Sequence, residues 1–245
     1  MTYRVVIPAR FASQRLPGKP LADINGRPMI VWVAEAVTRS GADELVVATD
    51  DDRVFDAVAR AGFRAMDTRT DHPSGSDRVM EVVARCGWPE DDVVLNVQGD
   101  EPLVPPAVLD QLAASLTDAA GFASATLCEP IARLEDLLNP NVVKVVRDAE
   151  NRALYFSRAA IPHRRDGWTS NDGAPPADGR WWRHVGVYAY RVWALKRFVS
   201  LPTGLLEDLE KLEQLRLLEN GMDMRVEQAC EPVPGGVDTE ADLQR

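Results

Sequence analysis

A basic loop follows the first apolar run of the chain. Residues 5–7 are apolar and β-branched, which predicts a short buried strand. The loop behind this strand carries three cations and two small residues, namely Arg10, Ser13, Arg15, Gly18 and Lys19. Backbone N–H groups and fixed cations at the carboxyl end of a strand suit a polyanion such as a triphosphate. The glycine patterns of the P-loop and of dinucleotide-binding folds are absent, so the loop predicts a phosphate site of another kind.

Two aspartates supply carboxylates for a divalent cation. Asp100 follows the apolar run 93–97 and Gly99, which places it at the same edge of the predicted sheet as the basic loop. Mg²⁺ takes one or two protein carboxylates together with substrate phosphates, and Asp100 meets that requirement. Asp238 lies in a glycine-rich turn near the C-terminus. From the residues alone it is either a second metal ligand or, by default, the N-cap of the last helix.

Several other polar residues have both a functional and a structural interpretation. Residues 72–78 suit the edge of a base or sugar, or form a helix N-cap at Ser76. Arg78 and Arg158 would make a fork for a substrate carboxylate. A lone Arg or His at the end of a strand, such as His184, is nevertheless more often structural.

Two further segments favour structural interpretations. Glu213 and Gln214 are most simply part of the solvated face of a late helix, predicted over 205–218. The acidic run 50–52 resembles the D-x-D metal pair of sugar-nucleotide transferases, but helix capping explains it better.

Strand and helix patterns alternate along the first half of the chain. Apolar β-type runs predict strands at 5–7, 44–48, 93–97, 123–127, 142–146, 185–190 and 224–227. Helical patterns occupy 28–39, 53–61, 77–86 and 106–116. This order predicts an α/β fold with a mostly parallel sheet and helices on both faces. The second half is mixed, and its Pro- and Gly-rich segment 163–183 predicts a long loop.

The overall composition limits the partners of the chain. Its 245 residues and 45% hydrophobic content suffice for a normal core. A formal net charge of −10 argues against a nucleic-acid partner. Cys86, Cys128 and Cys230 are too widely spaced for a disulfide framework or a zinc site. Neither a signal peptide nor a membrane-spanning run is apparent, so these features predict a cytoplasmic protein without a membrane partner.

Several motifs, taken in order, resemble the cytidylyltransferases that make CMP-sugars, most closely those that activate 3-deoxy-D-manno-octulosonate (Kdo). The resemblance is carried by the A-S-x-R-L-P-G-K-P-L core of 12–21 and by 71–78, 96–102, 139–146, 154–162, 183–191, 212–217 and 237–242. It implies a Rossmann-like three-layer α/β sandwich with a mostly parallel mixed sheet and a small dimerisation subdomain. It also implies one domain over 1–245, with a CTP-binding half at 1–130 and a sugar-binding and dimerisation half at 131–245.

The resemblance implies roles for individual residues. The nucleotide-binding set is Pro8, Ala9, Arg10, Ser13, Arg15, Lys19, Ser74, Gly75 and Gln98. The sugar-binding set is Arg78, Gln98, Arg158, His184, Tyr188, Glu213 and Gln214. The catalytic set is Arg10, Lys19 and Asp100. Within the first set Ser74 and Gly75 are expected to hold the cytosine and ribose, and Asp100 and Asp238 would bind the Mg²⁺ cofactor.

The implied reaction is the activation of Kdo with CTP for lipopolysaccharide biosynthesis. The C2 hydroxyl of the sugar attacks the α-phosphorus of CTP in line and pyrophosphate leaves, with Mg²⁺ assisting. CTP and Kdo are the implied small-molecule substrates, and a homodimer is the implied assembly. Two alternatives stay open: a cytidylyltransferase for another acidic sugar, such as 8-amino-Kdo or a sialic acid, and a nucleotide-binding regulator without turnover.

Overall fold

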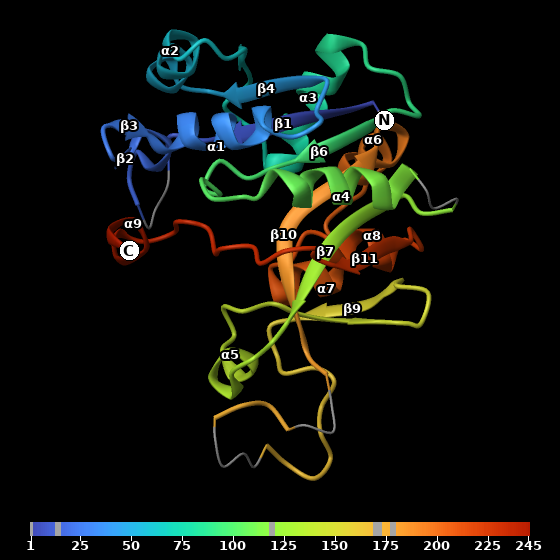
Figure 1. Cartoon of the computed structure of the whole chain (residues 1–245). Helices are drawn as coiled ribbons and strands as arrows, with labels where there is room; N and C mark the ends of the chain where they lie inside the picture. The colour runs from blue at the N-terminus through green and yellow to red at the C-terminus, as the bar shows by residue number, and fades with distance from the viewer. Residues whose placement is uncertain (1, 13–15, 118–120, 169–172, 177–179) are drawn as a thin grey trace.

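A nine-stranded mixed sheet forms the centre of the computed structural model (Figure 1), which describes residues 2–12, 16–117, 121–168, 173–176 and 180–245. The main path of this sheet runs β11-β7-β10-β6-β1-β4-β5, and β8 and β9 extend it from β10. The strands are β1 Tyr3–Ala9, β4 Glu44–Thr49, β5 Ala65–Asp67, β6 Val93–Asn96, β7 Ser124–Pro130, β8 Lys144–Arg147, β9 Ala153–Ser157, β10 Trp182–Arg191 and β11 Met224–Gln228. A separate hairpin pairs β2 Asp23–Ile24 with β3 Arg27–Pro28. Strands from both halves of the chain therefore share one sheet.

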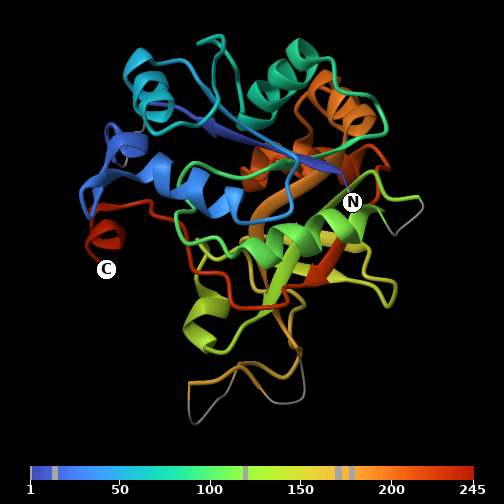
Figure 2. The same ribbon diagram turned by 45° about the horizontal axis from the view of Figure 1, so that its top comes forward.

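Helices cover both faces of this sheet (Figures 1 and 2). They are the 3-10 helix η1 Lys19–Leu21 and α1 Met29–Thr38, α2 Asp52–Arg60, α3 Gly75–Cys86, α4 Pro106–Thr117, α5 Leu134–Leu138, α6 Val192–Ser200, α7 Leu205–Glu210, α8 Leu215–Glu219 and α9 Glu240–Gln244. Val5 and Ile7 of β1 belong to the core under α1, α2 and α4, whereas the intervening Val6 belongs to the core under α3 and α6. This alternation confirms the predicted α/β sandwich with helices on both faces. No helix within the described ranges combines the length and the apolar character needed to cross a membrane.

The strands of the first half run parallel and end at one edge of the sheet. β1 pairs in parallel with β4 and β6, and β4 pairs in parallel with β5. Val6 lies opposite Asn96, so the loops after β1 and β6 leave the sheet side by side. β10 runs antiparallel to β6 and sets Tyr188 opposite Asn96. Residues from the second half thereby reach the edge at which β6 ends.

The prediction of one continuous helix over 205–218 is wrong, because the chain forms the two short helices α7 and α8 instead. Lys211, between them, has a left-handed backbone with a φ of 53°. The Glu210 carboxylate accepts hydrogen bonds from Ser157 Oγ at 2.5 Å and from Arg158 N at 2.9 Å. These contacts fix the end of α7 against β9 and override the helical periodicity of the sequence.

A small extension lies below the sheet in Figure 1. It contains α5 and the described parts of the long loop expected over 163–183, and the strands β8 and β9 of the sheet connect to it. Its apolar cluster consists of Ile131, Leu137 and Trp181. The fully buried Lys144 donates to three backbone carbonyls, of Asn139 at 2.8 Å, Val142 at 2.5 Å and Arg158 at 2.6 Å. The ammonium group therefore ties the segment before β8 to the end of β9.

Candidate active site

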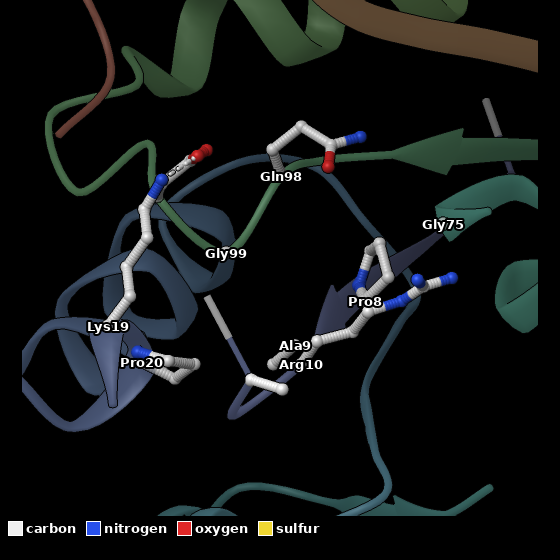
Figure 3. Close-up of a pocket in the computed structure, with 10 residues that line it drawn as sticks. Pro8, Ala9, Arg10, Lys19, Pro20, Gly75, Gln98 and Gly99 are labelled. Carbon is white, nitrogen blue, oxygen red and sulfur yellow. Dashed lines mark hydrogen bonds and ion pairs between the residues drawn. The ribbon is translucent and has the colours of Figure 1, made fainter. Parts of the chain in front are cut away.

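A cavity of about 240 Å³ opens where β1 and β6 end (Figure 3). It is lined by the end of β1, the loops after β1 and β6, η1 and the start of α3, through Pro8, Ala9, Arg10, Ala12, Lys19, Pro20, Gly75, Gln98, Gly99 and Asp100. In Figure 3 the side chains of Lys19 and Arg10 lie toward opposite ends of this cavity. The structure therefore brings together the basic loop and the aspartate segment that the sequence predicts at one sheet edge.

The two loops approach each other closely because Gly99 has no side chain. A Cβ atom at this position would lie 3.2 Å from the Pro8 carbonyl oxygen and 3.4 Å from Ile30 Cδ1. Gly18 is needed for a different reason, since its φ of 69° starts η1 from a left-handed conformation. These two glycines set the shape of the cavity and the direction from which Lys19 enters it.

Lys19 lies between two carboxylates that are far apart in the sequence. Its Nζ contacts the Asp100 carboxylate and lies 2.8 Å from Asp238 Oδ1. The last segment of the chain reaches the cavity because Val237 N donates to the Asp100 carbonyl at 2.8 Å. The N-cap of α9 is Thr239, whose side chain accepts the capping hydrogen bond. The default interpretation of Asp238 as that helix cap is therefore wrong.

The same two carboxylates suit a divalent cation. Asp100 and Asp238 already hold one cationic group, the ammonium of Lys19, and oxygen donors of this kind are those that Mg²⁺ prefers. A cation held by this pair would take its remaining ligands from substrate phosphates and water. Burial, and after it the charge of Asp100, raise the pKa of Glu101 to about 8. This third carboxyl group is therefore mostly protonated at neutral pH and adds little charge to the pair.

The Arg10 side chain contacts the loop that precedes α3. Its Nη2 donates to the His72 carbonyl at 2.6 Å. Ser74 is the N-cap of α3 and accepts a hydrogen bond from Asp77 N at 3.3 Å. The alternative interpretation of this segment, a helix N-cap at Ser76, is wrong, because the cap lies two positions earlier at Ser74. The cap at Ser74 places the first residue of α3, Gly75, in the wall of the cavity.

A line of polar side chains leads from the cavity to the second half of the chain. Gln98 Nε2 donates to Asn96 Oδ1 at 3.1 Å, and Asn96 Nδ2 lies 3.5 Å from Ser76 Oγ. Ser76 Oγ in turn donates to Glu213 Oε1 at 2.7 Å. Burial raises the pKa of Glu213, and Gln214 is only 2% exposed. The interpretation of both residues as part of a solvated helix face is therefore wrong.

His184 and Tyr188 lie next to each other on β10. Their ring centres are 5.4 Å apart, and the Phe156 ring of β9 meets His184 edge-on at 5.0 Å. His184 Nε2 lies 3.0 Å from Thr126 Oγ1. Burial, and after it the charge of Arg183, lower the pKa of His184 to about 3. The imidazole is therefore neutral at physiological pH.

The two arginines expected to form one fork have separate partners. Arg158 Nε donates to the Glu210 carbonyl at 2.7 Å, and Nη1 donates to the Pro140 carbonyl at 3.2 Å. Arg78 is fully buried and pairs with Asp50 at 2.7 Å. The fork is therefore absent from these described residues, because each guanidinium group is bound within its own part of the fold.

The predicted site residues fall into distinct places. Those that line the cavity are Pro8, Ala9, Arg10, Lys19, Gly75, Gln98 and Asp100. Asp238 contacts one of these residues, Lys19, through an ion pair. Ser13 and Arg15 lie outside the described residues. Asp51 caps α2, as the capping interpretation of 50–52 predicts.

Sequence reasoning missed two buried polar residues beside the site. Asn96 ends the apolar strand β6 with no exposed surface and bonds to Gln98. Thr126 lies inside the apolar run 123–127 and contacts His184. In both cases the available signal is a single polar residue within or at the end of a run that is otherwise apolar.

Comparisons with known proteins identify the family of the chain. The Cytidylyltransferase family model matches residues 4–224. The chain belongs to the cytidylyltransferase family. The 3-deoxy-manno-octulosonate cytidylyltransferase of Alcanivorax borkumensis is 52% identical over 246 residues, which cover 100% of this chain and 97% of the relative. The enzyme of the same name from Cellvibrio japonicus is 53% identical over 247 residues, which cover 100% of this chain and 96% of the relative.

A solved structure supports the same family assignment. The structure of CMP:2-keto-3-deoxy-manno-octonic acid synthetase complexed with CTP superposes with a TM-score of 0.88 at 42% identity. The alignment covers 99% of this cytidylyltransferase and 95% of the solved chain. The match to the family model ends at residue 224, before Asp238, so the contact of Asp238 with Lys19 rests on the geometry of this cytidylyltransferase itself.

The low pKa of His184 predicts a specific acid sensitivity. Between the ordinary pKa of histidine and about 3, the unfolded chain binds a proton at this position and the folded protein does not. Stability is therefore lost as the pH falls below the ordinary histidine value. Replacing His184 with Gln removes this loss, so the wild type should lose about 2 kcal/mol more unfolding free energy than H184Q between about pH 7 and pH 5.

Urea unfolding of both proteins at each pH measures this difference. The exposed His163 provides the matched control, because H163Q should follow the pH dependence of the wild type. Parallel curves for the wild type and H184Q would contradict a neutral, buried imidazole.

Proposed function

We propose that this cytidylyltransferase transfers CMP from CTP to Kdo and releases pyrophosphate, for use in lipopolysaccharide biosynthesis. The observation that carries the proposal is the placement of Lys19, Asp100 and Asp238 at one end of a cavity on the carboxyl edge of the sheet. A solved relative of 42% identity is complexed with CTP, and relatives of about half identical sequence are named for Kdo. These likenesses support both the nucleotide and the sugar.

The nucleotide half of the reaction needs positioning and charge neutralisation. In nucleotidyl transfer the attacking C2 hydroxyl oxygen bonds to the α-phosphorus while the bond to the pyrophosphate oxygen breaks. Lys19 and Arg10 extend toward opposite ends of the cavity, so they place two positive charges along a bound triphosphate. Fixed charges of this kind stabilise the negative charge that grows on the departing pyrophosphate. No covalent bond between the protein and the nucleotide is required.

We propose Mg²⁺ as the cofactor, held by Asp100 and Asp238. Their carboxylates converge on the Lys19 ammonium, which supports a cation position between them. A bound Mg²⁺ neutralises phosphate charge and lowers the pKa of a coordinated hydroxyl group. The aspartates orient that charge because Asp100 is fixed after Gly99 and Asp238 is fixed by the bond from Val237 N to the Asp100 carbonyl.

We propose that the sugar binds beyond Gln98, next to the line of polar side chains that leads to Glu213. Glu213 is held by Ser76, and His184 and Tyr188 lie on the neighbouring strand β10. Arg158 supplies a cation on this side, and its guanidinium group is bound by the neutral carbonyls of Glu210 and Pro140. A sugar carboxylate would be a stronger partner for it than either carbonyl group.

Pyrophosphate release tests the proposed reaction directly. The purified protein is given CTP and Mg²⁺ with Kdo, 8-amino-Kdo or N-acetylneuraminate in parallel. Release with Kdo at the highest kcat/KM is the expected result. Release with another acid only would keep the transferase chemistry and replace the sugar. No release with any acid, from folded protein that binds CTP, would favour a regulator without turnover.

Removing the charge of Lys19 should strongly reduce turnover. The substitution Lys19→Met keeps most of the side-chain length and removes the ammonium group that faces the triphosphate. We expect kcat/KM for CTP to fall by about 10²–10³-fold, the usual size for an electrostatic group at a transition state. The control is Lys196→Met, since Lys196 pairs with Glu90 on the surface. A rate for K19M close to that of K196M would exclude Lys19 from phosphate binding.

Removing one carboxylate should change the metal requirement rather than the fold. For Asp238→Asn we expect the Mg²⁺ concentration at half-maximal rate to rise by roughly 10–100-fold, at least the size known for groups that only support a metal ligand. Glu240→Gln, in the exposed first turn of α9, is the matched control. Thermal unfolding monitors the fold of both variants, and an unchanged Mg²⁺ dependence of D238N would remove Asp238 from the metal site.

We propose that the active form is a homodimer built through the second half of the chain. Four large apolar side chains of this half are at least half exposed, namely Leu138, Leu154, Leu205 and Leu209. Exposed apolar surface of this kind supports an interface between subunits. Light scattering measures the mass in solution, and a monomer at assay concentration would contradict the proposal. We also propose a cytoplasmic location, where CTP is available as substrate.

A further inference from the structure

Strand β10 contains an irregularity directly opposite Thr126. The pairing of β10 with β7 shifts register between Val185 and Tyr188, so that Val185 lies opposite Leu127 and Tyr188 opposite Thr126. Thr126 is fully buried at this point. Its Oγ1 lies 2.9 Å from the Val185 carbonyl oxygen and 2.8 Å from the Val187 carbonyl oxygen. The Thr126 hydroxyl group therefore lies within hydrogen-bond distance of two backbone carbonyl groups of β10.

The same hydroxyl group touches the ring of His184. His184 Nε2 lies 3.0 Å from Thr126 Oγ1, so three polar atoms surround one hydroxyl group. A hydroxyl has one proton to donate, and a carbonyl oxygen can only accept. If Nε2 carried no proton, Thr126 would face three acceptors with a single donor. If Nε2 is protonated, Thr126 accepts a hydrogen bond from the ring and donates its single proton to one of the two carbonyl groups, so the ring is no longer a competing acceptor.

The surroundings keep this ring neutral as well as oriented. Phe156 meets it edge-on at 5.0 Å and the Tyr188 ring lies at 5.4 Å. Burial and the neighbouring charge of Arg183 lower the pKa of His184 to about 3. A neutral imidazole with its proton on Nε2 has a free lone pair on Nδ1. Nδ1 is then a hydrogen-bond acceptor and cannot donate.

We propose that Thr126 is a positioning residue that holds His184 in the Nε2–H tautomer, so that Nδ1 accepts a hydrogen bond from a hydroxyl group of the sugar acid. The inference rests on the proposed function, in which His184 belongs to the sugar side of the site. It assigns a chemistry to that contact, because an acceptor nitrogen binds a hydroxyl group and repels a carboxylate. The sugar carboxylate is then left to the cation of Arg158.

The tautomer of the wild-type protein is the first test. Protein labelled with ¹⁵N at histidine gives long-range ¹H–¹⁵N correlations that distinguish a protonated Nε2 from a protonated Nδ1. The chain has three histidines, and the loss of signals in H184Q assigns those of His184. We expect Nε2–H in the free protein without substrates. A protonated Nδ1 would overturn the proposal, whatever the variants show.

Substitutions at Thr126 then test its role. Thr126→Val keeps the shape and removes the hydroxyl group, whereas Thr126→Ser keeps the hydroxyl group. We expect T126V to lose the pure Nε2–H pattern and to raise the KM for Kdo by about tenfold, the size of one hydrogen bond. The KM for CTP should change by less than about twofold, and T126S should restore both the spectrum and the KM.

Ser124→Ala is the matched control, since Ser124 lies two residues earlier on β7 and its buried Oγ has no hydrogen-bond partner among the described residues. S124A should keep the wild-type spectrum and KM. Equal KM values for T126V and the wild type, or equal effects of T126V and S124A, would refute a specific role of Thr126. The spectrum is recorded without substrate, so it tests the tautomer separately from the reaction. If the protein shows the Nε2–H tautomer but does not use Kdo, the proposed function is overturned, and the link between Thr126 and His184 remains.

Discussion

The ion pairs of Lys19 connect the beginning and the end of the chain at one point. Asp100 and Asp238 each contact Nζ, and without that charge two carboxylates would face each other. Like charges repel, so the Lys19 ammonium between the two aspartates stabilises this position of the C-terminal segment. The hydrogen bond from Val237 N to the Asp100 carbonyl fixes the backbone of the same segment. The Lys19 ammonium group and this hydrogen bond therefore hold the C-terminal segment beside the cavity.

The antiparallel strand β10 brings residues from the second half of the chain close to this cavity. Because β10 lies beside β6, Tyr188 is opposite Asn96, and His184 lies closer to the start of the same strand. The hydrogen bonds between Gln98, Asn96 and Ser76 then continue to Glu213, which lies between α7 and α8. A buried polar line of this kind is stable only when its members satisfy one another. The nucleotide side and the proposed sugar side are thus one connected structure.

Local sequence patterns predicted the parts of this structure that depend on local physics. The buried strand at 5–7 follows from its unbroken apolar, β-branched run, and the shared sheet edge of the basic loop and Asp100 follows from the order of strands and helices. The break at Lys211 could not be predicted this way, because it depends on the contact of Glu210 with Arg158 across 52 positions. The same holds for Asp238, whose partner Lys19 lies 219 positions away. Its local sequence is typical of a helix start, and the cap proved to be the next residue.

The arginines predicted to bind substrate differ in the charge of their partners within the protein. Arg78 is buried against the Asp50 carboxylate, so an internal anion already balances its charge. The described partners of Arg10 and Arg158 are instead the neutral carbonyls of the segments around them. A carbonyl group orients a guanidinium without neutralising it, and a phosphate or carboxylate oxygen forms a stronger bond with the same N–H groups. The proposed binding of substrate anions by Arg10 and Arg158 would therefore break no described ion pair, whereas Arg78 would have to leave Asp50.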